Sequence, residues 1–208
     1  GPTNAIVTRD IDLSQVGNGS NRVWVTNALG QDRTYQGVIT PSNDGNIRLA
    51  SGANNLIISG LSDRLGGASS TAGLIFGYDH ANAIVLTGNH LGQITAAASG
   101  TTAGNGVVSV RVNNDISGPV TINRGSIVNI NGNGLSQPLG TGPVTILGGT
   151  LNTDNTSSAL FGNNVFNLFG GSTLFLDNSA VTTTNSNRRL LGSANIALSS
   201  SIFRLLGD

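Results

Sequence analysis

Apolar residues along this chain come in short runs, and glycine, asparagine or aspartate separates one run from the next. The runs are rich in β-branched residues and too short for helices, so they predict strands. The expected strands cover residues 5–8, 22–26, 46–49, 55–58, 74–76, 83–86, 107–112, 126–130, 150–152, 173–176 and 201–205. The pattern therefore predicts an all-β protein.

One segment occurs twice: residues 118–127 (GPVTINRGSI) return as residues 142–151 (GPVTILGGTL). A repeat of this length, made of short β-prone runs, is typical of a solenoid in which each repeat is one coil. Further along the chain, the glycine-rich or small-residue corners that precede the expected strands are 23 and 28 residues apart. In the first half, residues 52–58 resemble residues 80–86 at a spacing of 28. We therefore expect a right-handed parallel β-helix of about eight or nine coils, roughly 40 Å long. A propeller or sandwich is the competing prediction, but hairpin signatures are weak.

Composition agrees with a stacked architecture. Only 10% of the 208 residues are charged, and all of them are arginine or aspartate. In a solenoid, equivalent side chains of successive coils lie one strand spacing apart, where like charges repel. Neutral asparagine, serine and threonine avoid that penalty, and lysine and glutamate, which favour exposed helices, are absent.

Several partner classes receive no support from the sequence. The net charge is zero, which gives no reason to expect nucleic acid or an acidic membrane as partner. Cysteine is absent, and no apolar run is long enough for a transmembrane helix. Gly1-Pro2 looks like the remnant of a cleaved tag, so we expect residues 3–208 to be one β-helical domain, cut from a longer protein.

The run from Pro138 to Leu151 (PLGTGPVTILGGTL) resembles the autotransporter-associated β-strand repeat, and the similarity extends over residues 118–153. Gly125-Ser126 departs from the Gly-Thr that this family prefers. The resemblance implies a β-helical passenger segment of a secreted or cell-surface bacterial protein. It carries no catalytic or binding residues to transfer.

Candidate chemistry is sparse. Asp79-His80 and His90 lack the further ligands or nucleophile that a metal site or relay needs. The aspartates of residues 9–12, and the pair Arg188-Arg189, do not form the carboxylate and basic cluster of a polysaccharide-cleaving enzyme. Trp24, Tyr35 and Tyr78 could stack on sugars, but they are scattered. We therefore predict no catalytic, cofactor-binding or metal-binding residues, and no cofactor.

Three functions remain as hypotheses. The first is a structural passenger that supports display, adhesion or self-association at a bacterial surface, beside other domains of its own chain. The second is an adhesin that binds glycans or host surfaces through the loop regions 17–35 and 59–70. The third, a polysaccharide-cleaving enzyme, is the weakest of the three, because no catalytic cluster supports it.

Overall fold

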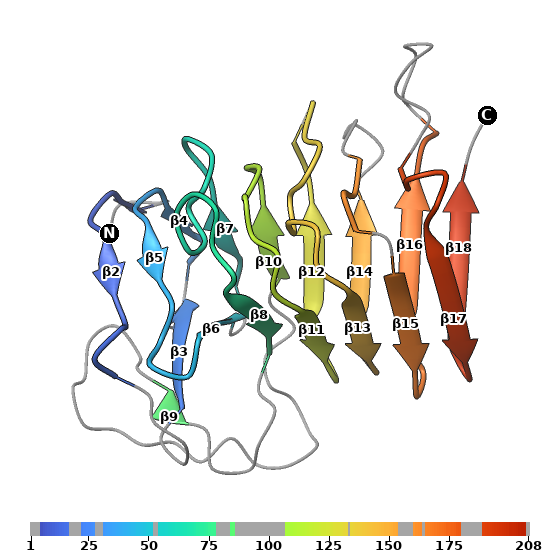
Figure 1. Cartoon of the computed structure of the whole chain (residues 1–208), viewed down its shortest axis with the longest axis horizontal. Helices are drawn as coiled ribbons and strands as arrows, with labels where there is room; N and C mark the ends of the chain where they lie inside the picture. Colours follow the sequence, from blue (N-terminus) through green and yellow to red (C-terminus); the bar gives the residue numbers. More distant parts are fainter. Residues whose placement is uncertain are drawn as a thin grey trace.

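The computed structural model describes residues 5–16, 22–27, 31–51, 54–77, 84–85, 107–132, 134–153, 160–163, 165–179 and 189–206. Within these ranges every regular element is a β-strand, which confirms the expected all-β class. Two large sheets face each other across the core, and a short third sheet lies beside them (Figure 1).

In the described part of the chain, each of the two large sheets has eight strands. Sheet 1 consists of β1 (Ala5–Val7), β4 (Arg33–Tyr35), β7 (Leu56–Ile58), β10 (Val107–Val110), β12 (Ile127–Ile130), β14 (Thr150–Thr153), β16 (Thr173–Asp177) and β18 (Ile202–Leu206). Sheet 2 consists of β9 (Ile84–Val85), β3 (Val23–Asn27), β6 (Asn46–Ser51), β8 (Gly73–Phe76), β11 (Val120–Asn123), β13 (Val144–Leu147), β15 (Val165–Phe169) and β17 (Asn195–Ser199). Sheet 3 pairs β2 (Ile11–Asp12) with β5 (Ile39–Thr40).

All neighbouring strands of these sheets are parallel, and the chain passes alternately through sheet 1 and sheet 2. Single parallel bridges, such as Ile39 to Leu65 and Phe161 to Leu190, continue the third side of the coil. This topology is a parallel β-solenoid, because hairpins of a sandwich or propeller would pair antiparallel strands.

The predicted number of coils is slightly too high. Sheet 1 has eight strands, and its last strand, β18, begins a turn that the described residues do not complete. The strand at residues 84–85, β9, adds no turn between β8 and β10. It pairs instead with β3 at the edge of sheet 2, with Val23 opposite Ile84. The resemblance between 52–58 and 80–86 is therefore not a repeat of the stack, because β7 and β9 belong to different sheets.

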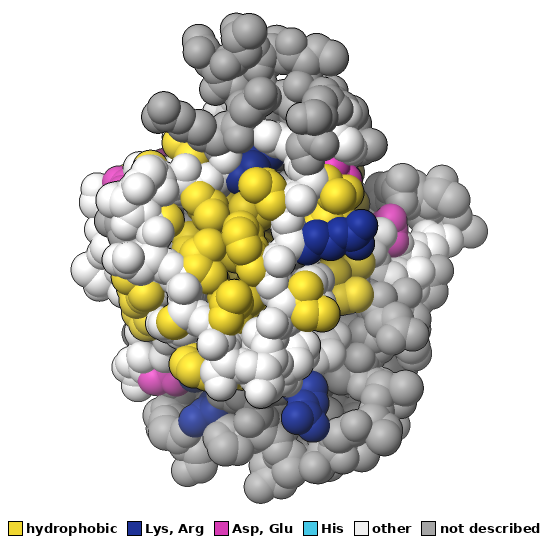
Figure 2. Space-filling view, turned by 90° about the vertical axis from the view of Figure 1, so that its right-hand side faces the viewer, with side chains coloured by type: hydrophobic (Ala, Val, Ile, Leu, Met, Phe, Trp, Pro, Cys, Tyr) yellow, Lys and Arg dark blue, Asp and Glu magenta, His cyan; other side chains and the backbone are white. Residues whose placement is uncertain are grey.

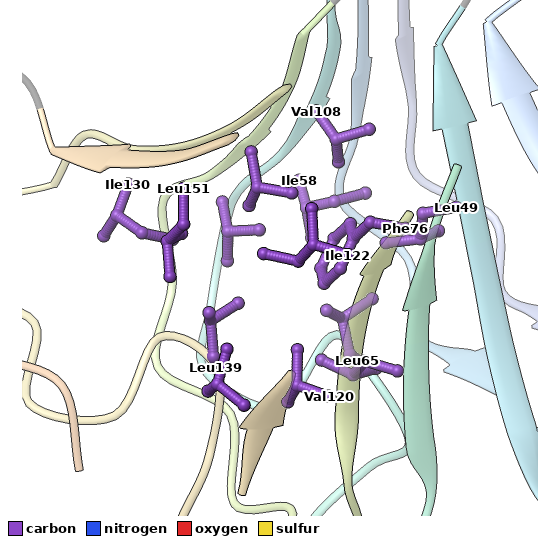
Figure 3. Packing of buried hydrophobic residues seen from close by; sticks show 14 of the residues in the cluster. Leu49, Ile58, Leu65, Phe76, Val108, Val120, Ile122, Ile130, Leu139 and Leu151 are labelled. Atoms are coloured by element: carbon purple, nitrogen blue, oxygen red, sulfur yellow. The ribbon is translucent and has the colours of Figure 1, made fainter. Parts of the chain in front are cut away.

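The core is built from columns of apolar side chains that run along the solenoid (Figure 3). One column of sheet 1 places Val108, Val128, Leu151 and Leu174 in register on successive strands, and all four are buried. The other apolar columns of the large sheets are Tyr35, Ile58, Val110 and Ile130, which the polar Thr153 follows; Ile47, Leu74, Val120, Val144 and Phe166; and Leu49, Phe76, Ile122, Ile146 and Leu168. Each side chain packs on the coils before and after it, so burial depends on stacking.

The corners between the sheets leave no room for side chains at some glycines. A Cβ atom at Gly118 would lie 2.1 Å from the Ala72 carbonyl oxygen, and one at Gly142 would lie 1.9 Å from the Gly118 oxygen. The repeated Gly-Pro pairs therefore mark places where successive backbones meet.

Candidate functional site

Arg48 on β6 is a buried charge on the outer face of sheet 2. Its neighbours Ile47 and Leu49 belong to the core, so strand alternation turns the Arg48 side chain outwards, yet only 2% of its surface is exposed. Its guanidinium forms an ion pair with Asp44, donates to Ser42 Oγ at 3.2 Å, and lies 5.7 Å from the ring centroid of Trp24. The described part of the chain thus contains one compact charged cluster on this face, with an indole beside it.

The ion pair fixes the charge of Asp44. Partial burial alone would raise the pKa of this carboxyl, but hydrogen bonds from Arg48 and Ser42 and the charge of Arg48 outweigh it. The pKa of Asp44 therefore lies well below its ordinary value. A carboxylate held ionised in this way is a poor general acid or base near neutral pH, so the cluster serves structure rather than proton transfer.

Three other aspartates of the described residues, Asp10, Asp63 and Asp115, support corners of the coil. Asp10 accepts a hydrogen bond from the Val38 amide at 2.7 Å, which ties the first coil to the second. Asp63 accepts one from the Asp115 amide at 2.7 Å, and Asp115 accepts from the Ser69 amide and hydroxyl at 3.0 Å. These carboxylates accept hydrogen bonds from backbone amides and, at Asp115, also from the Ser69 hydroxyl. In the ranges that the structure describes, no three His, Cys, Asp or Glu residues come together to hold a metal ion.

Asn114 ties three coils together at the third corner. Its side chain is fully buried, and Oδ1 accepts a hydrogen bond from the Leu65 amide at 3.0 Å. Nδ2 donates to the Pro138 carbonyl at 2.8 Å and to the Val112 carbonyl at 3.3 Å. The sequence alone does not mark Asn114, because nothing in a run of polar residues shows which one turns inwards.

The structure places few of the candidate residues where they could act on a ligand. Trp24 and Tyr35 are buried, with 1% and 4% of their surfaces exposed, so neither offers a face for a sugar. Trp24 donates from Nε1 to the Gly77 carbonyl at 3.2 Å, and Tyr35 donates to the Arg9 carbonyl. Burial, together with the negative charge of Asp10, raises the pKa of Tyr35 to about 12.

The remaining candidates divide into two groups. Arg189 is buried and donates to the Asp177 carbonyl at 2.9 Å, so it belongs to the scaffold. Tyr78, Asp79, His80, His90 and Arg188 lie outside the described residues.

The loop region 59–70 is partly built into the solenoid. Leu65 is fully buried and bridges to Ile39, whereas Leu61 is 75% exposed at the surface. Region 17–35 contains two strands of the stack, β3 and β4, so it is less of a side loop than the sequence suggested.

The outer face of sheet 1 carries a column of neutral side chains in register. Ser109, Asn129 and Asn152 occupy equivalent positions on β10, β12 and β14. Phe175 and Arg204 continue this column, and the Arg204 guanidinium lies 5.1 Å from the Phe175 ring centroid. No charge repeats from strand to strand along this column, as expected from the composition.

The chain matches no known protein family, no curated protein and no solved structure. Among the residues that the structure describes, no helix is long and apolar enough to cross a membrane.

Proposed function

We propose that this chain is a structural passenger segment of a secreted or cell-surface protein, which supports display, adhesion or self-association. The observation that carries the proposal is the continuity of the stack: buried columns run through successive strands of both large sheets. Such a body resists bending because every coil is packed on its neighbours, and its length follows from the number of coils. A spacer needs these two properties.

Two further features support the proposal. Among the described residues, Asp44 forms an ion pair with Arg48, and Asp63 and Asp115 accept hydrogen bonds at corners of the coil, so all three carboxylates support the stack. The autotransporter-associated repeat pattern falls on residues 118–153, which the structure folds into β11 to β14. The resemblance gives the proposal its secreted location.

The first experiment tests whether length follows coil number. Three extra copies of residues 118–141, inserted after position 141, should lengthen the particle by about 14 Å, because each coil adds about 4.8 Å. Small-angle X-ray scattering measures the longest dimension. The matched control inserts the same number of glycine and serine residues at the same place, which should form a loop and leave the rod length unchanged.

A second experiment tests the spacer function itself. The chain is fused between a membrane anchor and a fluorescent reporter, and quenching by a membrane dye reports the height of the reporter. The three added repeats should raise the reporter by about the same 14 Å. An unchanged height, with the rod lengthened in solution, would refute the spacer role.

A glycan-binding adhesin is the second candidate, and the strongly exposed Leu61 in the 59–70 loop favours it. A glycan array with Leu61→Ser as the matched variant separates the two functions. Selective binding that the variant loses would support the adhesin, whereas a pure spacer shows no selectivity. Incubation with acidic and neutral polysaccharides should release no new chain ends.

A further inference from the structure

The loop that follows β7 contains an arginine without a partner among the described residues. Arg64 is half-buried, and its guanidinium forms no hydrogen bond and no ion pair with any described residue. Its Nε is buried, and only the terminal nitrogens reach the surface. Burial of Nε fixes the guanidinium in place, so an anion that binds the terminal nitrogens meets a positioned donor.

The Arg64 side chain folds back onto a run of backbone amides that donate to no other group. A Cβ atom at Gly60 would lie 3.6 Å from Arg64 Nε, so the guanidinium lies beside Gly60. Gly60, Leu61 and Ser62 are exposed, and their amides make no hydrogen bond within the described residues. Gly60 has a φ of 106°, which few other residues adopt. Successive amides of a tight turn bind anions, and a positive charge beside them strengthens that binding.

The carboxylate next to this loop in sequence is held towards another coil. Asp63 Oδ1 accepts from the Asp115 amide at 2.7 Å, and the Asp63 amide donates to the Asn113 carbonyl at 2.8 Å. Both bonds lead to the following coil, and no ion pair joins Asp63 to Arg64. Asp63 therefore does not neutralise the guanidinium by direct contact.

A second arginine, Arg111, lies on the next coil beside the start of the loop. It is opposite Ser59, because its amide donates to the Ile58 carbonyl at 2.9 Å. Its side chain is exposed, and its Nε donates to Asn131 Oδ1 at 2.8 Å. Because this partner is neutral, the charge of Arg111 adds to the attraction that an approaching anion meets.

The surroundings of these donors indicate the class of ligand. Leu61, which carries one of the unbonded amides, is 75% exposed, so an apolar surface lies beside the anion donors. An acidic sugar combines a carboxylate or sulfate with the apolar C–H groups of its ring, and it can use both features. A nucleic acid needs a more continuous basic surface. Viewed along the stack, the arginine side chains of the described residues lie apart from one another (Figure 2).

We propose that the loop at residues 60–64 binds the carboxylate or sulfate group of an acidic polysaccharide. The terminal nitrogens of Arg64 and the amides of Leu61 and Ser62 donate to the oxyanion, and the Leu61 side chain lies against the sugar ring. This inference gives a ligand class to the glycan-binding adhesin, the second candidate function, and it rests on that candidate. The spacer function does not depend on it.

The test compares two arginines that lie at glycine corners. Arg64→Gln removes the charge and keeps a polar side chain. Arg124→Gln is the control, because Arg124 is exposed and its Nε would lie 3.5 Å from a Cβ atom at Gly148. The amides of Gly125 and Gly148, however, already donate to backbone carbonyls. Both variants change the net charge equally, so the comparison separates a built site from general attraction.

Isothermal titration calorimetry at low salt measures binding of polygalacturonate, heparin and the neutral polysaccharide dextran. The unmodified chain and Arg124→Gln should bind one or both of the acidic polymers equally well and should not bind dextran. Arg64→Gln should bind the same polymer about tenfold to a hundredfold more weakly, because a charged hydrogen bond is lost. An unchanged circular dichroism spectrum shows that the variant is folded. In an NMR titration of the unmodified chain, the amide signals of residues 60–62 should shift and that of Gly125 should not.

Four results would overturn the inference. The first is absence of binding to both acidic polymers, and the second is equal weakening in the two arginine variants. The third is a set of amide shifts that leaves out residues 60–62. The fourth is tighter binding of poly-glutamate than of either acidic polysaccharide, which would make an acidic protein segment the ligand. If the acidic polymers fail but the glycan array shows binding that Leu61→Ser removes, the adhesin candidate stands and only the oxyanion site fails.

Discussion

Replacing Asn114 by alanine should destabilise the solenoid more than the loss of one polar surface residue would. The fully buried side chain of Asn114 holds the Leu65 amide and the Pro138 carbonyl, which belong to the preceding and following coils. Asn114→Ala leaves both groups without the hydrogen bonds that Asn114 makes. At about 1–3 kcal/mol for each of these two buried unsatisfied groups, the expected loss in free energy of unfolding is about 2–6 kcal/mol.

Urea unfolding followed by far-UV circular dichroism and by the fluorescence of Trp24 measures this loss. Trp24 lies on β3, near the N-terminal end of the stack, and reports on that end, whereas circular dichroism reports on all strands. Because Asn114 links neighbouring coils, its loss should weaken the interfaces on both sides of its coil. The fluorescence and circular dichroism transitions can then occur at different urea concentrations.

The matched control is Asn152→Ala. The Asn152 amide oxygen is buried without a hydrogen-bond partner, so its removal should change the free energy of unfolding by less than about 1 kcal/mol. If both variants lose the same free energy of unfolding, the hydrogen bonds that Asn114 makes between coils do not contribute more to stability than the side chain of Asn152 does. The same holds if Asn114→Ala costs less than about 1 kcal/mol.

Three further predictions concern charge and corner geometry. Because the pKa of Asp44 is lowered in the folded protein, its ion pair with Arg48 stabilises the fold above the ordinary aspartate pKa, and this contribution is lost as pH falls below about 4. Acid unfolding of Asp44→Asn should therefore depend less on pH than that of the unmodified chain. The pKa of Tyr35 is raised to about 12, so the neutral phenol stabilises the fold below about pH 10, and this contribution is lost as pH rises towards 12. Alkaline titration, followed at the tyrosinate absorption band, should show a group that ionises late and that Tyr35→Phe removes. Gly142→Ala places a Cβ atom 1.9 Å from a backbone oxygen and should lower the free energy of unfolding, measured by thermal unfolding, by about 3 kcal/mol. Gly192→Ala is the control, because its Cβ atom would meet nothing within 4 Å and should change this free energy by no more than about 0.5 kcal/mol. Equal losses in the two variants would contradict the argument that the Gly142 corner has no room for a side chain.

The repeated segment allowed part of the fold to be predicted at the level of register. Aligning residues 118–123 with 142–147 places Val120 beside Val144 and Ile122 beside Ile146, and the structure pairs these residues on β11 and β13. Inward side chains must lie in register from coil to coil to be buried, so a repeated apolar pattern predicts which residues pair on neighbouring strands.

The same alignment fails one corner later. It places Ile127 beside Leu151, but the structure pairs Val128 with Leu151 and Ile127 with Thr150. The corner before β12 contains one more residue than the corner before β14, and Gly125 there has a positive φ of 75°. A shift by one residue exchanges the inward and outward faces of a strand. Runs of similar residues on both faces do not reveal such a shift.

Strand β15 was missed for a different reason. Its sequence, Val165–Phe169, contains an asparagine between apolar residues and was not among the expected strands. The signal was present, because Phe169 precedes a Gly-Gly pair just as Leu147 does, and the structure places Leu147 opposite Phe169. Following the Gly-Gly corner, rather than the apolar run, would have found the strand.

Burial of the Arg48 cluster could not be predicted from local sequence. Arg48 lies between two core residues on β6, and its outward position is normally exposed to solvent. Trp24 beside it, and Asp44 at the preceding turn, are ordinary neighbours in a list of residues. Only the packing of distant segments makes this outer position part of the interior.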